Sequence, residues 1–286
     1  MSTNNLPKLI TFDGEARSGK GTIVQATKDY LRDHEGYKVM LIDAGQVFRV
    51  LVVGATQGGV NVDNPAEIDE FLNNEAEAEK CVQLVKDVYH MEKAERDALL
   101  YNNEVGANSA KIGARPRSQE FKDMLLRKWL RDAYIDGYEI VLLDGRALEE
   151  TGKMLAGENL CDFVMGLYFT CDAVVGARRT LGFATRQFDE LNDTEQADVN
   201  ELVAQINARN KADHERKVQP VLPPKRAPVY RLPESPSNDS KASPGTAMYV
   251  FDTSAEMTID EMTKPVAQLV AKAISASRPS GSQTTA

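Results

Sequence analysis

The sequence predicts an α/β fold with a parallel sheet, and three observations support this prediction. Five short apolar runs alternate with longer segments of helical spacing. A glycine-rich turn joins the first run to the next segment, and three later runs end at an aspartate. The 286 residues are 42% hydrophobic and 27% charged, which is enough apolar material to bury a sizeable core. The predicted strands lie at residues 9–12, 37–42, 139–144, 163–169 and 247–251.

The composition limits the partners that we expect. The net charge of −9 argues against binding to nucleic-acid polymers or anionic membranes, so an arginine-rich site has to be a local pocket. The three cysteines have no metal-like spacing, which favours reduced thiols. Residues 1–5 do not resemble a signal peptide, and no apolar run reaches the length of a membrane span. We therefore expect a monomeric cytoplasmic protein whose partners are small molecules.

The first predicted strand leads into a phosphate-binding loop at Gly14–Thr22. In such a turn, successive backbone N–H groups converge on an anion, and the following helix N-terminus adds its dipole. Gly14, Gly19 and Gly21 lack a Cβ, so the chain can curl against phosphate oxygens. Lys20 supplies a point charge for the β- and γ-phosphates. Gly21 stands where the strict motif has Ser or Thr, so we expect Mg²⁺ to be held largely by water and substrate oxygens.

Helical spacing and capping signals place the other elements. Residues 20–35 form the first predicted helix, and a second begins at Gln46. The acidic segment 67–79 is expected to be a solvated helix, whereas residues 81–85 fit either a short strand or a helical turn. Asp172 is expected to cap a helix that carries two arginines. Further helices are predicted at residues 104–114, 118–134, 195–218 and 259–276.

Polar residues beyond two predicted strands extend the candidate site. Arg49 follows the second strand, and ligands of open α/β sheets bind at the carboxyl ends of strands. Asp144 ends the third strand, where a carboxylate beside a phosphate loop usually faces the metal and its water ligands. Arg146 would face the phosphates. The basic residues within 117–131 form either a solvated face or an anion clamp.

Residues 220–246 differ in composition from the rest of the chain. They contain seven of the twelve prolines, which predicts a connector, and residues 235–240 are expected to be a mobile loop. The segment 220–223 matches a PxxP pattern, although a plain connector is favoured over a partner motif. Residues 279–286 are expected to fray.

In combination, these motifs resemble a cytidylate kinase of the bacterial type, from Leu9 to the final helix. Gly14–Thr22 resembles the ATP loop of that family, and residues 43–49 resemble its Asp-Ser-Gly-x-x-Tyr-Arg element, whose arginine grips the monophosphate. Residues 104–106 resemble the opening of the family's nucleobase-pocket helix, and residues 125–127 resemble the helix whose arginine approaches the base. Residues 144–146 match the family's Asp-Gly-Arg motif, and Arg209, Asp213 and Arg216 keep the spacing of its lid. On a helix the three lid residues would line one edge, although such spacing also fits a surface ion pair.

The resemblance implies a P-loop NTPase fold with a five-stranded parallel sheet flanked by helices, a monophosphate-binding insertion and a lid. The implied core covers residues 8–55, 139–180 and 247–277, with the insertion at about 56–138 and the lid and Pro-rich connector at about 181–246. The implied reaction moves the γ-phosphoryl group of ATP, with Mg²⁺, to CMP or dCMP. The implied ATP-binding residues are Gly14, Glu15, Ala16, Arg17, Ser18, Gly19, Lys20, Gly21 and Thr22. The implied substrate-binding residues are Asp43, Arg49, Arg127, Asp144, Arg146, Arg209, Asp213 and Arg216, and the implied catalytic residues are Lys20, Arg146, Arg209 and Arg216.

Departures from the family pattern concern mainly the base-reading residues. Ala147 stands where the family has an aspartate that helps to read the cytosine amino group, and Ala110 stands where a pocket serine is expected. Glu149 or Glu150 is a candidate replacement for the lost acceptor. The remaining departures are Ala44 for a serine, Phe48 for a tyrosine and Tyr101 for an arginine. The sequence therefore predicts phosphoryl transfer and leaves the acceptor base open.

Three alternative functions remain at this stage. Residues 210–213 match the Asn-Lys-x-Asp motif of GTPases, but they follow an amphipathic helical pattern instead of a buried strand. The chain could also phosphorylate AMP, dTMP or a metabolite, or be a weakly catalytic regulatory protein that binds nucleotides. No Cys, His or Ser constellation resembles an activated nucleophile, so we expect direct transfer without a covalent enzyme intermediate.

Overall fold

The computed structural model describes residues 6–234 and 246–277, and the chain divides into two compact units. Unit 1 contains the residues up to Ile42, then Leu130–Asn210, and the residues from Leu222 onward. Unit 2 contains Asp43–Trp129 and Lys211–Val221. The expectations for residues 1–5, 235–240 and 279–286 concern segments outside the described residues.

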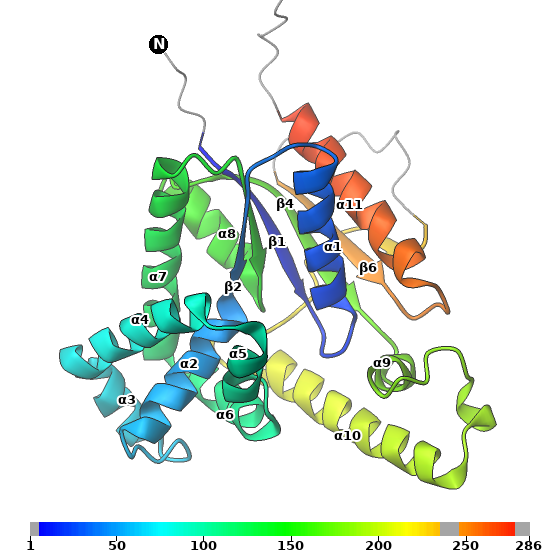
Figure 1. Cartoon of the computed structure of the whole chain (residues 1–286), viewed down its shortest axis with the longest axis horizontal. Helices are drawn as coiled ribbons and strands as arrows, with labels where there is room; N and C mark the ends of the chain where they lie inside the picture. Colours follow the sequence, from blue (N-terminus) through cyan, green and yellow to red (C-terminus); the bar gives the residue numbers. More distant parts are fainter. Residues whose placement is uncertain (1–5, 235–245, 278–286) are drawn as a thin grey trace, which may run out of the picture. The chain divides into compact units, whose positions relative to one another are not determined.

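Unit 1 is built on a six-stranded sheet with the order β2-β3-β1-β4-β6-β5 (Figure 1). The recorded pairs β1–β3, β1–β4, β4–β6 and β5–β6 are all parallel. The strands are β1 Lys8–Gly14, β2 Val39–Asp43, β3 Ile140–Asp144, β4 Asp162–Thr170, β5 Val229–Arg231 and β6 Ala247–Asp252. The predicted parallel α/β fold is thus confirmed.

The prediction of five strands was wrong by one short edge strand. Strand β5 lies in the Pro-rich segment that the sequence assigned to a connector, and Val229 pairs with Val250 of β6. Three residues between prolines are too few to show strand alternation, which explains the miss. The pairing is reinforced by apolar contacts, because the ring of Tyr230 lies 6.0 Å from that of Phe251 and Leu232 is fully buried.

Helices cover both faces of this sheet. Helices α1 (Lys20–Asp33) and α11 (Ile259–Ala276) pack side by side on one face, in front of the sheet in Figure 1. Helix α8 (Leu148–Gly157) packs on the other face, against β1 and β4. A register shift between Leu9 and Ile10 lets Phe163 face Gly152 of α8, while Met165 joins the core beneath α1 and α11. Unit 1 also contains α9 (Ala173–Thr180), the 3₁₀ turn Phe188–Glu190 and most of α10 (Asp193–Glu215).

Unit 2 is helical and has a core of its own, to which Val50 and Leu51 of α2 and Phe71 of α3 contribute. Its helices are α2 Ala44–Gln57, α3 Pro65–Asn73, α4 Glu75–His90, α5 Lys93–Leu100, α6 Asn103–Gly113 and the start of α7 Pro116–Ile135. Residues 81–85 belong to a helix, which resolves the alternative left by the sequence. The acidic segment forms two helices because Asn74 interrupts it and caps α4.

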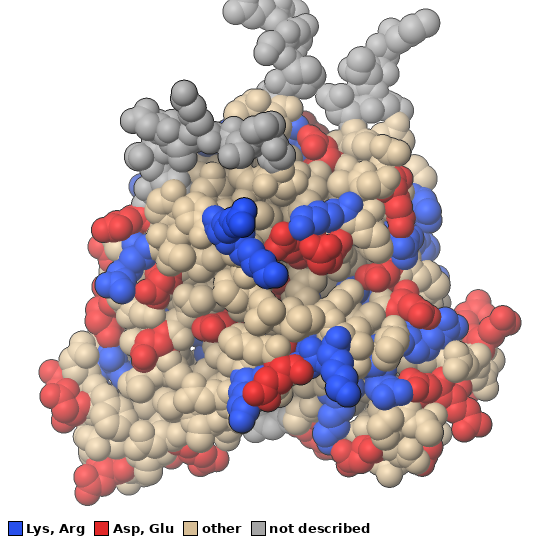
Figure 2. All heavy atoms as spheres, turned by 180° about the vertical axis from the view of Figure 1, so that it is seen from behind, with Lys and Arg blue, Asp and Glu red and all other residues tan. Residues whose placement is uncertain are grey.

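Charges of both signs are interspersed on the face that Figure 2 displays. Within residues 6–234 and 246–277, no helix is long and apolar enough to cross a membrane. The three cysteines are free and buried, as the sequence favoured.

Candidate functional site

The loop between β1 and α1 has the geometry of an anion site, and two of its glycines are structurally required. Gly14 has a φ of +146°, and a Cβ there would lie 2.3 Å from the backbone oxygen of Phe169. Gly19 has a φ of +78° and precedes α1, which has no side-chain cap at this end. A Cβ at Gly21 would meet no protein atom within 4 Å, and a close approach of this residue to phosphate oxygens stays a prediction.

Hydrogen bonds within unit 1 hold the loop in place. Glu15 N donates to Phe169 O at 2.9 Å, and Ser18 Oγ donates to Glu15 O at 3.0 Å. The buried Thr253 donates its hydroxyl to Ser18 O at 2.9 Å. These hydrogen bonds occupy the carbonyl oxygens of Glu15 and Ser18 and the N–H group of Glu15. The loop therefore has a defined shape in which its other N–H groups can meet an anion.

Lys20, the first residue of α1, is held at the end of β3. Its ammonium group forms an ion pair with Asp144 and donates to Gly145 O at 2.9 Å. The sheet register explains this pairing, because Asp144 lies beside Phe12, two residues before the loop. The structure thus brings together the predicted phosphate-binding lysine and the predicted metal-facing carboxylate.

Asp13 is a buried carboxylate that the sequence analysis missed. Its Oδ1 accepts from Gly14 N at 2.7 Å, and its Oδ2 accepts from Leu148 N at 2.8 Å. Burial raises the pKa of this carboxyl, while the two N–H donors and the charges of Lys20 and Arg146 oppose the shift. Asp13 therefore ties the loop to the start of α8, and the charge of Arg146 acts in the same neighbourhood.

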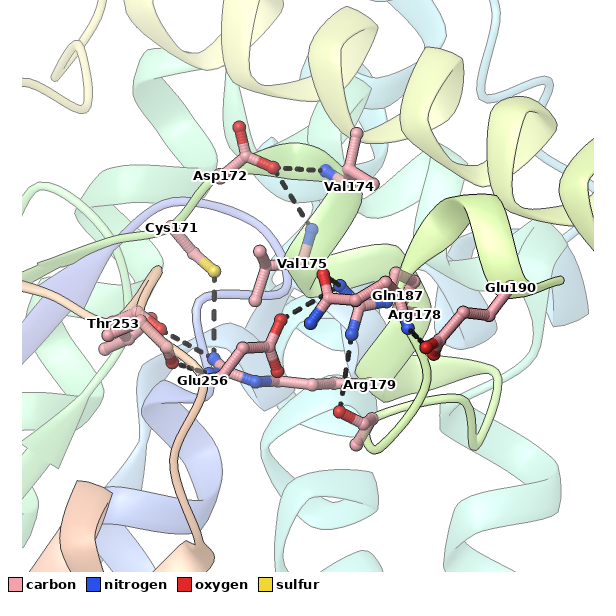
Figure 3. A network of polar contacts seen from close by, with 12 residues as sticks. Cys171, Asp172, Val174, Val175, Arg178, Arg179, Gln187, Glu190, Thr253 and Glu256 are labelled. Carbon is pink, nitrogen blue, oxygen red and sulfur yellow. Dashed lines mark hydrogen bonds and ion pairs between the residues drawn. The ribbon is translucent and has the colours of Figure 1, made fainter.

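A polar network supports the loop from the side of α9 (Figure 3). Asp172 caps α9 as predicted, by accepting from Val174 N at 2.9 Å and Val175 N at 3.1 Å. Arg179 donates to Thr253 O at 2.7 Å and to Ala255 O at 2.6 Å. The buried Arg178 pairs with Glu256 at 2.9 Å. Both arginines of α9 are thus used to attach residues 253–256, which in turn hold the loop through Thr253.

Asn210 reaches the loop from α10, and sequence reasoning gave it no such role. Its Oδ1 accepts a hydrogen bond from Ala16 N at 2.9 Å. Asn210 lies on helix α10, whereas the Asn-Lys-x-Asp motif of GTPases follows a buried strand. Residues 210–213 therefore do not have the structural context of that motif. The only feature of the sequence that pointed to Asn210 was its position next to the predicted lid residue Arg209. Arg209 is exposed and also belongs to unit 1.

In unit 2, three side chains form what we call the Asp–Arg–Tyr cluster: Asp43, Arg49 and Tyr101. Asp43 caps α2, because its Oδ1 accepts from Gln46 N at 3.1 Å, so the helix begins two residues earlier than predicted. Tyr101 donates its hydroxyl to Asp43 Oδ2 at 2.8 Å. The Arg49 guanidinium carbon lies 4.7 Å from the centroid of the Tyr101 ring. The structure thus joins two predicted substrate-binding residues through a third.

The other predicted residues of unit 2 lie on α7, in the last turn of α10 and just after α10. Asp213 is buried, and Arg216 pairs with it at 3.8 Å. Helix α10 ends at Glu215, so Arg216 lies beyond it and not on the predicted continuous helix. The cause is a turn in which Arg216 donates to Gln219 O and Val221 N donates to Asp213 O at 3.0 Å. The remaining predicted residue of unit 2 is Arg127, which is half-buried on α7.

Helix α7 also carries buried polar groups that the sequence did not single out. Lys122 is buried and forms contacts with Asp123 at 3.0 Å and Gln219 Oε1 at 3.2 Å. Gln119 is buried and donates to Gly113 O at 2.5 Å. Its Oε1 has no hydrogen-bond partner among the described residues. A buried acceptor without a partner is costly, so a ligand N–H that reached it would be favoured.

Comparisons with known proteins agree with these features. A family profile described as "Cytidylate kinase" matches residues 10–230. A cytidylate kinase of Shewanella loihica is 27% identical over 230 residues, which cover 77% of this chain and 85% of the relative. A cytidylate kinase of Aeromonas hydrophila is 29% identical over 224 residues, with 77% and 85% covered. A solved structure of a putative kinase from Chloroflexus aurantiacus covers 94% of this chain and 98% of its own at 15% identity, and its TM-score of 0.37 is too low to support an argument.

Proposed function

The chain belongs to the cytidylate kinase family and is a nucleoside monophosphate kinase, and we propose that it transfers the γ-phosphoryl group of ATP to CMP or dCMP. The products would be ADP and CDP or dCDP. The observation that carries the proposal is the phosphate loop of unit 1, where Lys20 and Asp144 meet at a loop shaped by Gly14 and Gly19.

ATP is proposed to bind with its phosphates in the loop Gly14–Thr22. The backbone N–H groups and Lys20 would neutralise phosphate charge, and the phosphates would compete with Asp144 for the ammonium group. Asp144 would then face Mg²⁺, which brings charge neutralisation to the phosphates. Among the residues that the structure describes, no three His, Cys, Asp or Glu side chains form a group that could hold a metal ion. This fits an ion that takes most of its ligands from phosphate and water.

The acceptor monophosphate is proposed to bind in unit 2. Arg49 is the main candidate for its phosphate, because a guanidinium presents donors in a fork that matches a phosphate group. The phosphate is already an anion at neutral pH and needs little help from a general base. Catalysis is therefore positioning and charge neutralisation. The residues of unit 2 proposed to act with Arg49 are Asp43, Arg127, Asp213 and Arg216, and Arg146 and Arg209 of unit 1 are proposed to neutralise the charge of the transferred group.

Exclusion of water is the remaining requirement, because water would otherwise accept the phosphoryl group. We assign this role to the insertion at about residues 56–138 and to the lid at about 181–246. The assignment predicts that both segments become less accessible to proteases when ATP and CMP are added together.

The acceptor base depends on which group receives the hydrogen bond of a cytosine amino group. Ala147 cannot accept it. Glu149 and Glu150 are poorer candidates, because both pair with Lys153 on the surface of α8, at 2.6 Å and 2.9 Å, and the Glu150 side chain is 78% exposed. Gln119 Oε1 in unit 2 is a buried acceptor of the right kind. It supports a preference for CMP, with weaker discrimination against UMP than the family pattern implies.

The proposal is tested by coupled assays of the purified protein with CMP, dCMP, UMP, AMP and dTMP. CMP or dCMP should give the highest kcat/KM, and a preference for AMP or dTMP would refute the substrate assignment. Lys20→Ala should lower kcat by about 10²–10³ without changing the unfolding midpoint. Lys80→Ala, at a lysine side chain that is 71% exposed, is the matched control.

A second variant tests the base pocket separately. Ala147 has a φ of +56°, a conformation that Asp adopts more readily than Ala, so Ala147→Asp should fold. It should raise the CMP/UMP ratio of kcat/KM by about tenfold, the value of one added hydrogen bond to a charged group. An unchanged ratio would refute the pocket argument and leave the kinase assignment in place.

A further inference from the structure

We propose that Tyr101 is a positioning residue that holds Arg49 and Asp43 in the arrangement that receives the acceptor phosphate. The inference rests on the proposed function, and it assigns a role to a residue that replaces an arginine of the family pattern. Tyr101 lies directly after α5, and its backbone N–H donates to Asp97 O at 2.8 Å. Its place is therefore fixed by the end of a helix.

The side chain of Tyr101 contacts both partners at once. The hydroxyl donates to Asp43 Oδ2 at 2.8 Å, and the ring face covers the Arg49 guanidinium at 4.7 Å. Burial and the Asp43 carboxylate raise the pKa of Tyr101, so the phenol keeps its proton and remains a donor at neutral pH. One residue thus fixes the start of α2 and a side chain one turn further along the helix.

The geometry leaves Arg49 prepared for an oxyanion. A guanidinium that is covered on its face by a ring still presents its N–H groups at its edge. Among the described residues, Arg49 donates one hydrogen bond, from Nη1 to Leu100 O at 2.9 Å. The ring of Tyr101 and the carbonyl oxygen of Leu100 thus restrain the guanidinium at two points, and such preorganisation favours bidentate recognition of a phosphate.

A packing role does not account for Tyr101. The residue is 44% exposed, and it does not belong to the hydrophobic core of unit 2. Its contacts are with a carboxylate and a guanidinium, both of which the sequence had assigned to substrate binding. Removal of the hydroxyl or the ring should therefore change the binding of the acceptor and leave folding and ATP binding nearly unchanged.

The experiment compares Tyr101→Phe, which keeps the ring, with Tyr101→Leu, which removes it. Binding of CMP and of UMP is measured by calorimetry, and KM and kcat are measured for CMP and ATP. Tyr101→Phe should weaken CMP binding by about three- to tenfold. Tyr101→Leu should weaken it by about ten- to fiftyfold, because the cation–π contact is lost as well. KM for ATP and the unfolding midpoint should stay within error of the wild type.

Tyr89→Phe is the matched control, since Tyr89 is a 68% exposed tyrosine in the same unit. A double-mutant cycle with Asp43→Asn should show that the losses from Tyr101→Phe and Asp43→Asn are not additive. Unchanged monophosphate binding in both Tyr101 variants would overturn the inference, as would a loss of stability with no change in KM.

Failure of the proposed function has a different signature. In that case wild-type protein would show no turnover of CMP, while the effect of Tyr101 on the binding of CMP and UMP would still be measurable.

Discussion

The phosphate loop of unit 1 and the Asp–Arg–Tyr cluster of unit 2 are built from different parts of the chain. In the loop, the groups that would meet a ligand are mainly backbone N–H groups, held by contacts of the loop backbone with Phe169 and with the side chains of Asp13 and Thr253. In the cluster, the groups are side chains from α2 and from the residue after α5. The loop should therefore be sensitive to added Cβ atoms, and the cluster to the loss of individual side-chain atoms.

The largest effect is expected for a glycine substitution in unit 1. In Gly14→Ala, the new Cβ would meet backbone atoms of Phe169 at 2.3 Å and 2.7 Å, and the φ of +146° is unfavourable for alanine. In Gly54→Ala of unit 2, the Cβ would meet the side-chain sulfur of Cys81 at 2.7 Å, and that side chain can move. Urea unfolding should show a loss of about 4 kcal/mol for Gly14→Ala and about 1–2 kcal/mol for Gly54→Ala.

A control separates the collision from the backbone strain. Gly182 also lies in unit 1 and has a φ of +84°, but a Cβ there would face open space. Gly182→Ala should cost about 1–2 kcal/mol from strain alone. If Gly14→Ala were no more destabilising than Gly182→Ala, the close approach to Phe169 would not be what makes glycine necessary.

The same contrast explains what the sequence could predict. A loop made of backbone leaves glycine at fixed spacing between an apolar run and a helix, and this spacing singled out Gly14, Gly19 and Lys20, whereas Asp144 was singled out because it ends an apolar run. Elements with a strong periodic signal were also placed well, such as α11, whose bounds were predicted as the structure has them. Strand β5 was missed because its three residues gain their order from pairing with β6, which local sequence does not show.

The side-chain contacts of the site could not be predicted, because they depend on which segments the fold brings together. Tyr101 lies 58 positions from Asp43, and Asn210 lies 194 positions from Ala16. No spacing pattern in the sequence predicts either contact. Gln119 was hidden for another reason: a glutamine among the charged residues at the start of α7 gives no sign that it is buried with an unpaired oxygen. These residues mark the limit of motif-based reasoning.

A smaller effect is expected when a side chain that contacts the loop backbone is changed. Asn210→Asp keeps an oxygen for the Ala16 N–H but places a negative charge beside the proposed phosphate site. ATP binding should weaken by about tenfold, and the effect should shrink at high salt. Asn207→Asp, at an exposed position on the same helix and unit, is the matched control.

CMP binding should be weakened much less than ATP binding by Asn210→Asp, because Asn210 contacts the phosphate loop of unit 1, whereas Arg49, the main candidate for the acceptor phosphate, belongs to unit 2. Calorimetry with each nucleotide alone measures this difference. Equal weakening of ATP and CMP binding would contradict the assignment of separate sites to the two units.

The smallest expected effect is a difference in local stability between the two units. It can be measured through the reactivity of the cysteine thiols that each unit contains. Burial raises the pKa of Cys81 to about 11 and that of Cys161 to about 12, so very little thiolate is present in the folded protein at pH 8. Labelling by iodoacetamide should therefore require opening of the unit that holds each thiol. Cys81 reports unit 2, and Cys161 and Cys171 report unit 1.

We expect Cys81 to become reactive at lower urea concentrations than Cys161, because unit 2 lacks a sheet and its helices can separate with the loss of fewer backbone pairings. Labelling at several urea concentrations, followed by peptide mass spectrometry, gives the rate for each thiol, and Cys171 should follow Cys161. CMP alone should slow the labelling of Cys81 selectively, since a ligand stabilises the unit that binds it. If Cys81 and Cys161 showed the same dependence on urea, the chain would open as one cooperative body, and the difference between the units would be confined to how their sites are built.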